Sequence, residues 1–156
     1  MDEGRRAYAA ALKMLTRRDH GRAELAGKLA AKGFGEPAIT ATLERLAGLG
    51  YLDDRRFARL WADAALRSGR GVGPRIALEL RRRGIADGIV QEILAELAAE
   101  VDETELLRQQ MARRYAGFDP ATATDREKAR IFNWFRRRGF SGGAISAALR
   151  GRSPRD

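Results

Sequence analysis

The stretch Leu80-Arg81-Arg82-Arg83-Gly84-Ile85 decides the fold, because the chain contains two further versions of it. The earlier version, at residues 29–34, reads LAAKGF, and the later one, at residues 135–140, reads FRRRGF. Their glycines are 51 and 55 residues apart. A repeat of this length is typical of tandem helical units, each of which buries its apolar face against the next part of the chain.

Apolar residues recur at the same distances from each glycine: eight and four residues before it, and six and ten after it. This spacing predicts a helix that ends at the glycine, followed by a second helix. A cation precedes each glycine, where it favours the negative end of the helix dipole. The aligned apolar residues are Leu25, Leu29, Ile39 and Leu43; Ile76, Leu80, Val90 and Leu94; and Ile131, Phe135, Ile145 and Leu149.

The periodicity predicts an all-α chain of about nine helices in three tandem three-helix repeats, and no stretch alternates long enough to form a strand. We expect the repeats at residues 1–50, 51–102 and 103–152, with a frayed tail at 153–156. Charged residues make up 33% of the 156 residues, and mean hydropathy is −0.44. The clear apolar periodicity nevertheless indicates a folded protein.

Several function classes are disfavoured by composition. The chain contains no cysteine, so disulfides and thiolate metal sites are excluded. No apolar run approaches the length of a membrane span, and no apolar signal sequence precedes Arg17. We therefore expect a cytoplasmic protein that does not associate with membranes.

Three capping signals predict where helices start. Asp53 is predicted to cap a helix, with Leu52 before it and Phe57 at the fourth helical position as a hydrophobic staple. Thr124 and Glu127 form a capping box after the longest predicted loop, residues 117–124. Ser141 is expected to cap the last helix.

These motifs resemble the RecX family of regulatory proteins over roughly residues 5–150. The resemblance rests on three stretches: Tyr51-Leu52-Asp53-Asp54 with Phe57-Ala58; Arg75-Ile76 with Glu79-Leu80 and Gly84-Ile85; and Arg138-Gly139-Phe140-Ser141. The structural positions it singles out are Tyr51, Leu52, Asp53, Asp54, Phe57, Gly33, Gly84 and Gly139. One departure is Gly21, where the family usually begins its second helix with Ser.

The resemblance implies three repeats in an elongated, curved right-handed array. It also implies a protein that is not an enzyme and has no cofactor, and that binds the RecA recombinase filament on single- or double-stranded DNA. Such a protein usually inhibits strand exchange, ATP hydrolysis and co-protease activity, within DNA repair and the SOS response. We expect it to act as a monomer.

Catalytic or metal chemistry finds little support in the residues themselves. His20 is the only histidine, and its short polar turn predicts a solvated side chain. Asp53 and Asp54 are explained by helix capping rather than by a metal. The run Gly69-x-Gly71-x-Gly73 follows a helix and lacks the Lys-Ser/Thr of a phosphate loop, so a joint between helices is favoured over a phosphate contact.

A basic ridge is the main candidate binding site. Arg126, Arg130, Asn133 and Arg137 follow helical spacing opposite the predicted core, and only Glu127 is well placed to neutralise part of it. In the second repeat, Glu79 can pair with Arg75, Arg82 or Arg83, which favours a solvated face. The residues hypothesised to bind RecA or DNA are Arg126, Arg130, Asn133, Arg136, Arg137, Arg138, Arg82 and Arg70.

The charge distribution agrees with a polyanionic partner. The formal net charge is +9, and residues 106–156 carry +8 while residues 51–105 carry −2. A charge excess kept for solubility is the alternative. Trp61 and Trp134 could stack on bases, but their spacing favours core positions. A sequence-nonspecific DNA-binding protein acting without RecA is the alternative function.

Overall fold

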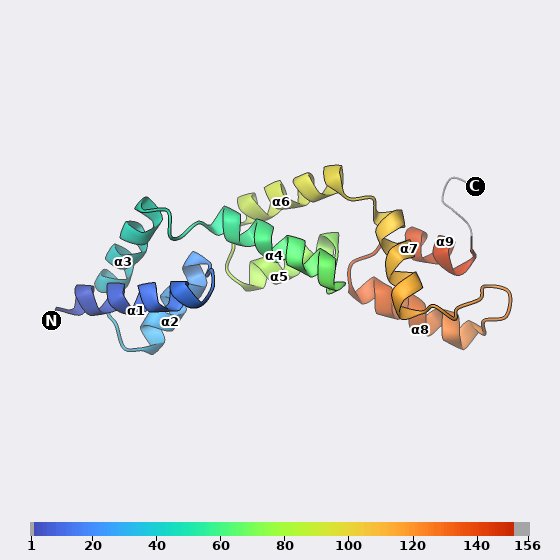
Figure 1. Ribbon diagram of the computed structural model, residues 1–156, viewed down its shortest axis with the longest axis horizontal. Helices are drawn as coiled ribbons and strands as arrows, with labels where there is room; N and C mark the ends of the chain where they lie inside the picture. The colour runs from blue at the N-terminus through green and yellow to red at the C-terminus, as the bar shows by residue number, and fades with distance from the viewer. Residues whose placement is uncertain (1, 152–156) are drawn as a thin grey trace. The chain divides into compact units, whose positions relative to one another are not determined.

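The computed structural model describes residues 2–151, and within them the chain forms nine helices and no strand (Figure 1). The helices are α1 Glu3–Arg17, α2 Arg22–Ala31, α3 Glu36–Gly48, α4 Asp54–Ser68, α5 Gly73–Arg82, α6 Asp87–Glu100, α7 Glu103–Arg114, α8 Asp125–Arg137 and α9 Gly142–Leu149. The all-α prediction is therefore confirmed for this part of the chain. The predicted tail, residues 153–156, lies outside the described residues.

The three repeated glycines end α2, α5 and α8 in the left-handed conformation, with φ of +92° at Gly33, +82° at Gly84 and +99° at Gly139. In each case the following amide donates to a carbonyl four residues before the glycine. These bonds join Phe34 to Leu29, Ile85 to Leu80, and Phe140 to Phe135. This is the Schellman pattern, which satisfies the last carbonyls of a helix and favours glycine. The predicted helix stops are confirmed.

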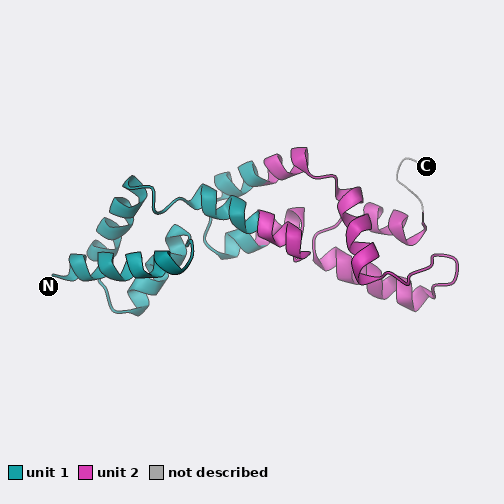
Figure 2. Cartoon of the chain, in the orientation of Figure 1, with its two compact units in different colours: residues 1–62, 79–93 teal, residues 63–78, 94–156 magenta. Residues whose placement is uncertain are grey.

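The chain divides into two compact units (Figure 2). Unit 1 contains residues 1–62 and 79–93, and unit 2 contains residues 63–78 and 94–156. Helices α4, α5 and α6 contribute residues to both units. The boundaries of the three predicted repeats stay a prediction, because the division into compact units follows contacts rather than repeats.

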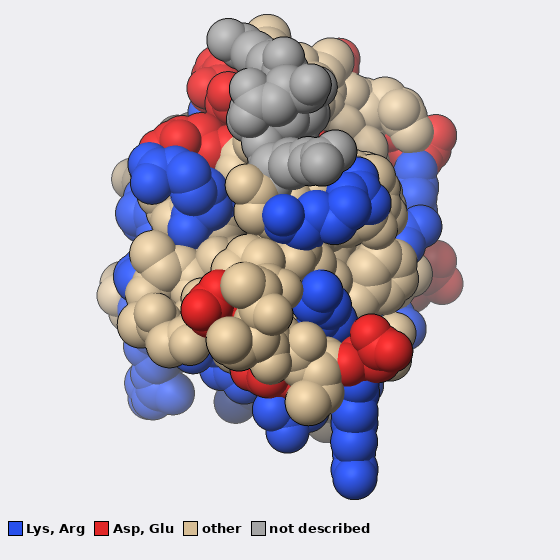
Figure 3. Space-filling model, turned by 90° about the vertical axis from the view of Figure 1, so that its right-hand side faces the viewer, with Lys and Arg blue, Asp and Glu red and all other residues tan. Residues whose placement is uncertain are grey.

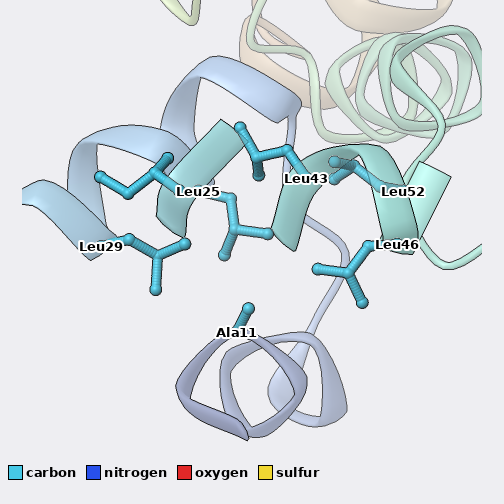
Figure 4. Packing of buried hydrophobic residues seen from close by; sticks show 7 residues of the cluster. Ala11, Leu25, Leu29, Leu43, Leu46 and Leu52 are labelled. Atoms are coloured by element: carbon cyan, nitrogen blue, oxygen red, sulfur yellow. The ribbon is translucent and has the colours of Figure 1, made fainter. Parts of the chain in front are cut away.

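The core of unit 1 is formed by α1, α2 and α3 (Figure 4). Small residues on α1, such as Ala11, allow leucines of α2 and α3 to approach it closely. Leu52, which precedes α4, is buried in the same cluster. The cluster consists of Ala11, Leu25, Leu29, Ile39, Leu43, Leu46 and Leu52.

The core of unit 2 lies mainly among α7, α8 and α9. Phe135 and Phe140 are fully buried, and their rings meet edge to face at 5.5 Å between centroids. Trp134 lies 5.0 Å from Phe135 and 6.2 Å from Tyr115 in similar geometry. Edge-to-face aromatic pairs stabilise a core beyond the area they bury. The buried cluster consists of Val72, Leu107, Ile131, Phe135, Phe140, Ile145 and Leu149.

His20 is buried, with only 4% of its surface exposed, so the prediction of a solvated side chain was wrong. Its Nδ1 lies 3.0 Å from the Arg18 carbonyl oxygen, and its Nε2 lies 3.0 Å from Lys28 Nζ. Burial lowers the pKa of the imidazole, and Arg18 and Lys28 lower it further against the opposing effect of the Arg18 carbonyl. The neutral ring can accept a hydrogen bond from Lys28, which explains a buried histidine between two cations.

The start of α2 is capped from a distant part of the chain. Gly21 stands at the N-cap and offers no side chain, but Asp54 Oδ1 accepts a hydrogen bond of 2.6 Å from the Arg22 amide. The neighbouring Asp53 caps its own helix through a 3.0 Å bond from the Arg56 amide, as predicted. The two adjacent carboxylates therefore cap two different helices, and both lie in unit 1.

The Asp54→Ala variant should lose about 1–2 kcal/mol of stability, because the orphaned Arg22 amide loses a charged acceptor. Adding Gly21→Ser should restore much of this loss, since a Cβ at position 21 would meet its neighbours no closer than 3.5 Å. Urea denaturation followed by circular dichroism measures both effects. Equal losses in the single and double variants would show that α2 does not depend on this cap.

Gly84 and Gly139 also pack closely against the start of a helix in the preceding part of the chain, α2 and α5 respectively. A Cβ at Gly84 would lie 2.5 Å from Ala23 Cβ in α2, within unit 1. A Cβ at Gly139 would overlap the Val72 carbonyl oxygen, just before α5, within unit 2. A Cβ at Gly33, by contrast, would meet nothing within 4 Å. The glycines at 84 and 139 therefore serve both a helix cap and a close approach.

A candidate polyanion-binding surface on α8

The predicted ridge forms along one exposed side of α8. Arg126, Arg130, Asn133 and Arg137 are all exposed, whereas Ile131 and Phe135 are buried on the opposite side. The Thr124 hydroxyl accepts from the Glu127 amide at 3.1 Å, so the helix starts where the capping signal predicts. We define the α8 ridge as Arg126, Arg130, Asn133 and Arg137.

The arginines of the α8 ridge make no ion pair or side-chain hydrogen bond within residues 2–151. Glu127, which is well placed by spacing, does not pair with Arg130 in this structure. On α5, by contrast, Arg82 pairs with Glu79 at 3.2 Å, as the spacing predicts. The positive charge of the ridge is therefore available to a partner, while that of Arg82 is partly neutralised.

The surface around these helices carries further cations. Figure 3 views the molecule from the side on which α7, α8 and α9 lie in Figure 1. Lys and Arg side chains are prominent along its lower and left edges, and Asp and Glu side chains lie among them more sparsely. Residues 106–156, which include α7 from Leu106 on, α8 and α9, carry a basic excess of +8 that would attract a polyanion at long range.

Arg136 and Arg138 have structural contacts at the end of α8. Arg136 donates to the Phe140 carbonyl oxygen at 2.9 Å, across the helix stop. Arg138 is half-buried, donates to the Trp134 carbonyl oxygen at 3.2 Å and lies 3.3 Å from the Trp134 ring centroid. Burial lowers the pKa of Arg138, and Arg114, Arg137 and Arg75 add like-charge repulsion. Arg136 and Arg138 therefore stabilise the helix end and shape its surface.

Arg70 and Arg138 line a common cavity of about 450 Å³, although they are 68 residues apart in sequence. Arg70 Nε donates to Ser68 Oγ at 2.9 Å on one side of this cavity. The cavity residues are Ser68, Gly69, Arg70, Gln110, Arg113, Arg114, Trp134 and Arg138, which we call the arginine pocket. All of them belong to unit 2. Arg82 of the hypothesised set is not among them.

Sequence reasoning missed the part of the arginine pocket that α7 contributes. Arg113 and Arg114 stand in the last turn of α7, and Gln110 lies one turn earlier. The Arg114 guanidinium lies 4.1 Å from the Trp134 ring centroid and 5.6 Å from that of Tyr115. The run Arg113-Arg114-Tyr115 was visible in the sequence, but helical spacing alone did not predict that it lies beside α8.

The glycine-rich run before α5 is a packed joint. Gly71 and Val72 are buried, and the Val72 amide donates to the Arg138 carbonyl oxygen at 2.7 Å. The Val72 amide is therefore already hydrogen-bonded within unit 2 and is not available to bind a phosphate. The interpretation as a joint between helices fits this contact better than a phosphate loop does.

Residues 2–151 lack two other kinds of feature, a metal site and a membrane-spanning helix. No group of three or more His, Asp or Glu side chains is arranged to hold a metal ion there. None of the described helices has the length and apolarity to cross a lipid bilayer.

The fold and surface define a helical-repeat protein whose exposed arginines suit recognition of a polyanion. The family models for the first, second and third three-helix domains of RecX match residues 7–46, 53–94 and 100–149. The chain therefore belongs to the RecX family. This is a family of regulatory proteins, not of enzymes.

Curated relatives agree with this assignment, and a solved structure agrees with the fold. The chain is 40% identical to a Regulatory protein RecX of Syntrophotalea carbinolica, over 89% of this chain and 91% of the relative. It is 44% identical to a protein of the same name from Halorhodospira halophila, over 89% and 83%. The fold matches a crystal structure of RecX from Lactobacillus salivarius with a TM-score of 0.75, at 22% identity and 96% coverage of both chains.

Proposed function

We propose that this chain is a cytoplasmic regulator that binds the RecA–DNA filament and inhibits RecA recombinase, ATPase and co-protease activities in DNA repair and the SOS response. Membership of the RecX family supports RecA as the partner. The unneutralised arginines of the α8 ridge are the observation that carries the contact with the filament. They suit the phosphates of single- or double-stranded DNA, which are held at close spacing within a filament.

The proposed inhibition results from occupying the filament and requires no reaction catalysed by this chain. Several helical blocks of one monomer would contact the filament together, so modest contacts act at high effective concentration. A protein bound in this way would exclude an incoming duplex and restrict the subunit motions linked to ATP turnover. The hypothesised contact residues are those of the α8 ridge, together with Arg136, Arg138, Arg70 and Arg82.

A titration against RecA tests this function. Increasing amounts of the protein are added to RecA filaments formed on single-stranded DNA, while ATP hydrolysis and strand exchange are measured. We expect both rates to fall together as the filament becomes occupied. Unchanged rates at saturating protein would contradict an inhibitory role, and increased rates would show the opposite regulation.

A sequence-nonspecific DNA-binding protein acting without RecA is the second candidate, because an arginine ridge suits the phosphates of any DNA. Retention on bare DNA and on RecA-coated DNA at about physiological salt distinguishes the two. We expect stronger retention on RecA-coated DNA. Preference for bare DNA would favour the second candidate.

A further inference from the structure

The arginine pocket combines a cavity with an unusual concentration of cations. Its volume of about 450 Å³ falls in the range of sites that hold small molecules, and exceeds what a lone phosphate ion would fill. Four of its eight lining residues are arginines, and none is Asp or Glu. It lies between the α4–α5 turn, the last turns of α7 and the end of α8, all within unit 2.

Three of the four arginines that line the arginine pocket are not paired with carboxylates in the described part of the chain. Arg113, Arg114 and Arg138 form no ion pair within the described part of the chain. The ionised neighbours that act on Arg138 are the cations Arg114, Arg137 and Arg75. Tyr115 acts on it in the opposite sense. The acidic residues of α7 and α8, Glu103, Glu105, Asp125 and Glu127, stand in the first turns of those helices, whereas Arg113, Arg114 and Arg138 stand at their C-terminal ends. Holding like charges together beside a half-buried guanidinium costs free energy, which an anion in the pocket would recover.

Gln110 supplies an independent observation. Its side chain is 95% buried, since only 5% of the residue is exposed. Both amide atoms, Oε1 and Nε2, lack a hydrogen-bond partner among the described residues. Buried amides are almost always paired, so a glutamine that is unpaired at both atoms indicates a partner that comes from outside the chain.

Trp134 forms an apolar wall of the pocket, and two arginine side chains contact its ring. The Arg138 and Arg114 guanidinium groups lie 3.3 and 4.1 Å from its ring centroid. These cation–π contacts hold the two guanidiniums in place, and planar guanidinium groups bind phosphate oxygens through paired donors. A bound anion would therefore draw on the same arginines that cover the indole, and its arrival would change the surroundings of the ring.

We propose that the arginine pocket binds one nucleotide unit, with its phosphate on Arg113, Arg114 and Arg138 and a polar edge of its base on the Gln110 amide. The phosphate is the shared chemistry of two sources, a free mononucleotide and one residue of a single DNA strand. The strand is favoured because this proposal rests on the proposed function, in which DNA is already part of the bound filament. Contact with Gln110 requires the covering side chains to shift when the nucleotide enters.

Tryptophan fluorescence tests the site directly and without RecA. The chain has two tryptophans, so Trp61→Phe leaves Trp134 as the only reporter. This protein is titrated with a short oligothymidylate, with thymidine monophosphate and with inorganic phosphate. We expect the oligothymidylate to change Trp134 emission in a saturable way. Equal affinity for the monophosphate would assign the pocket to free nucleotides. The proposal would be overturned if only inorganic phosphate gave a saturable response, or if none of the three probes changed the emission.

Two variants in the Trp61→Phe background separate binding from folding. Gln110→Leu keeps the side-chain volume and should weaken oligothymidylate binding at least about tenfold, because the base loses its polar partner. Its thermal midpoint should stay the same or rise, since an unpaired buried amide is removed. Arg114→Gln should weaken binding similarly. Wild-type affinity in both variants would contradict the proposal.

The RecA titration distinguishes failure of this site from failure of the proposed function. If Gln110→Leu loses no oligothymidylate affinity while the parent chain still inhibits RecA, the pocket assignment is wrong and the regulatory function stands. If oligothymidylate binds through Gln110 but RecA activity is unaffected, the pocket stands and the regulatory function fails.

Discussion

The Gly139→Ala variant is expected to lose about 3–5 kcal/mol of stability, enough to unfold much of unit 2. The glycine has φ of +99°, a conformation that costs other residues about 1–2 kcal/mol. The added Cβ would also overlap the Val72 carbonyl oxygen and lie 3.0 Å from the Arg75 amide nitrogen. Both neighbours are backbone atoms, so the joint between α5 and α8 would have to move. Urea denaturation followed by circular dichroism measures the loss.

Gly33→Ala is the matched control, because Gly33 has φ of +92° but open space around it. It should lose only the conformational cost, about 1–2 kcal/mol. Gly84→Ala should fall between the two, since its Cβ would meet the Ala23 Cβ at 2.5 Å. Adding Ala23→Gly should recover the steric part of that loss. Equal losses at positions 33 and 139 would contradict the close approach at Gly139.

Replacing Arg126, Arg130 and Arg137 together by alanine is expected to weaken binding to DNA-bound filaments on the order of tenfold or more. Each arginine that contacts a phosphate releases a counterion. The slope of log Kd against the logarithm of the salt concentration should therefore fall by about 2–3 in the triple variant. Folding should change little, because these side chains are exposed and have no partners within residues 2–151. Fluorescence anisotropy of labelled filaments at several salt concentrations measures both effects.

A matched control removes the same charge from another helix. Arg6, Lys13 and Arg17 are exposed on α1, and no side-chain ion pair of theirs occurs within the described residues. Their spacing of seven and four residues mirrors that of the α8 set. We expect the Arg6→Ala, Lys13→Ala, Arg17→Ala protein to bind almost normally. If both triple variants lost the same affinity and salt dependence, net charge rather than the α8 ridge would explain binding.

Local features of the fold were predictable from sequence because they depend on residues close together in the chain. The glycines at 33, 84 and 139 identify helix stops through their neighbours within one turn, and Thr124 identifies a helix start in the same way. The exposure of the α8 ridge followed from helical periodicity. These predictions needed no knowledge of tertiary structure.

Features that depend on side-chain packing rather than on a local sequence pattern were missed. His20 is buried and contacts Lys28 and the Arg18 carbonyl, and the polar composition of its turn gave no sign of this. Gln110 and Arg114 are separated from Arg138 by more than 20 residues, so no local pattern joins them into a cavity. Spacing also suggested that Glu127 would neutralise Arg130, whereas side-chain rotamers decide which of several possible pairs forms.

The bond from Asp54 to the Arg22 amide makes the folding of α2 conditional on that of α4. Opening of α4 removes the acceptor, so the first turn of α2 should fray in the same event. Amide hydrogen exchange at the start of α2 would then report the unfolding of α4 as well as local motion. The Asp54 carboxylate thus couples the two helices, because it stands in the first turn of α4 and caps the start of α2.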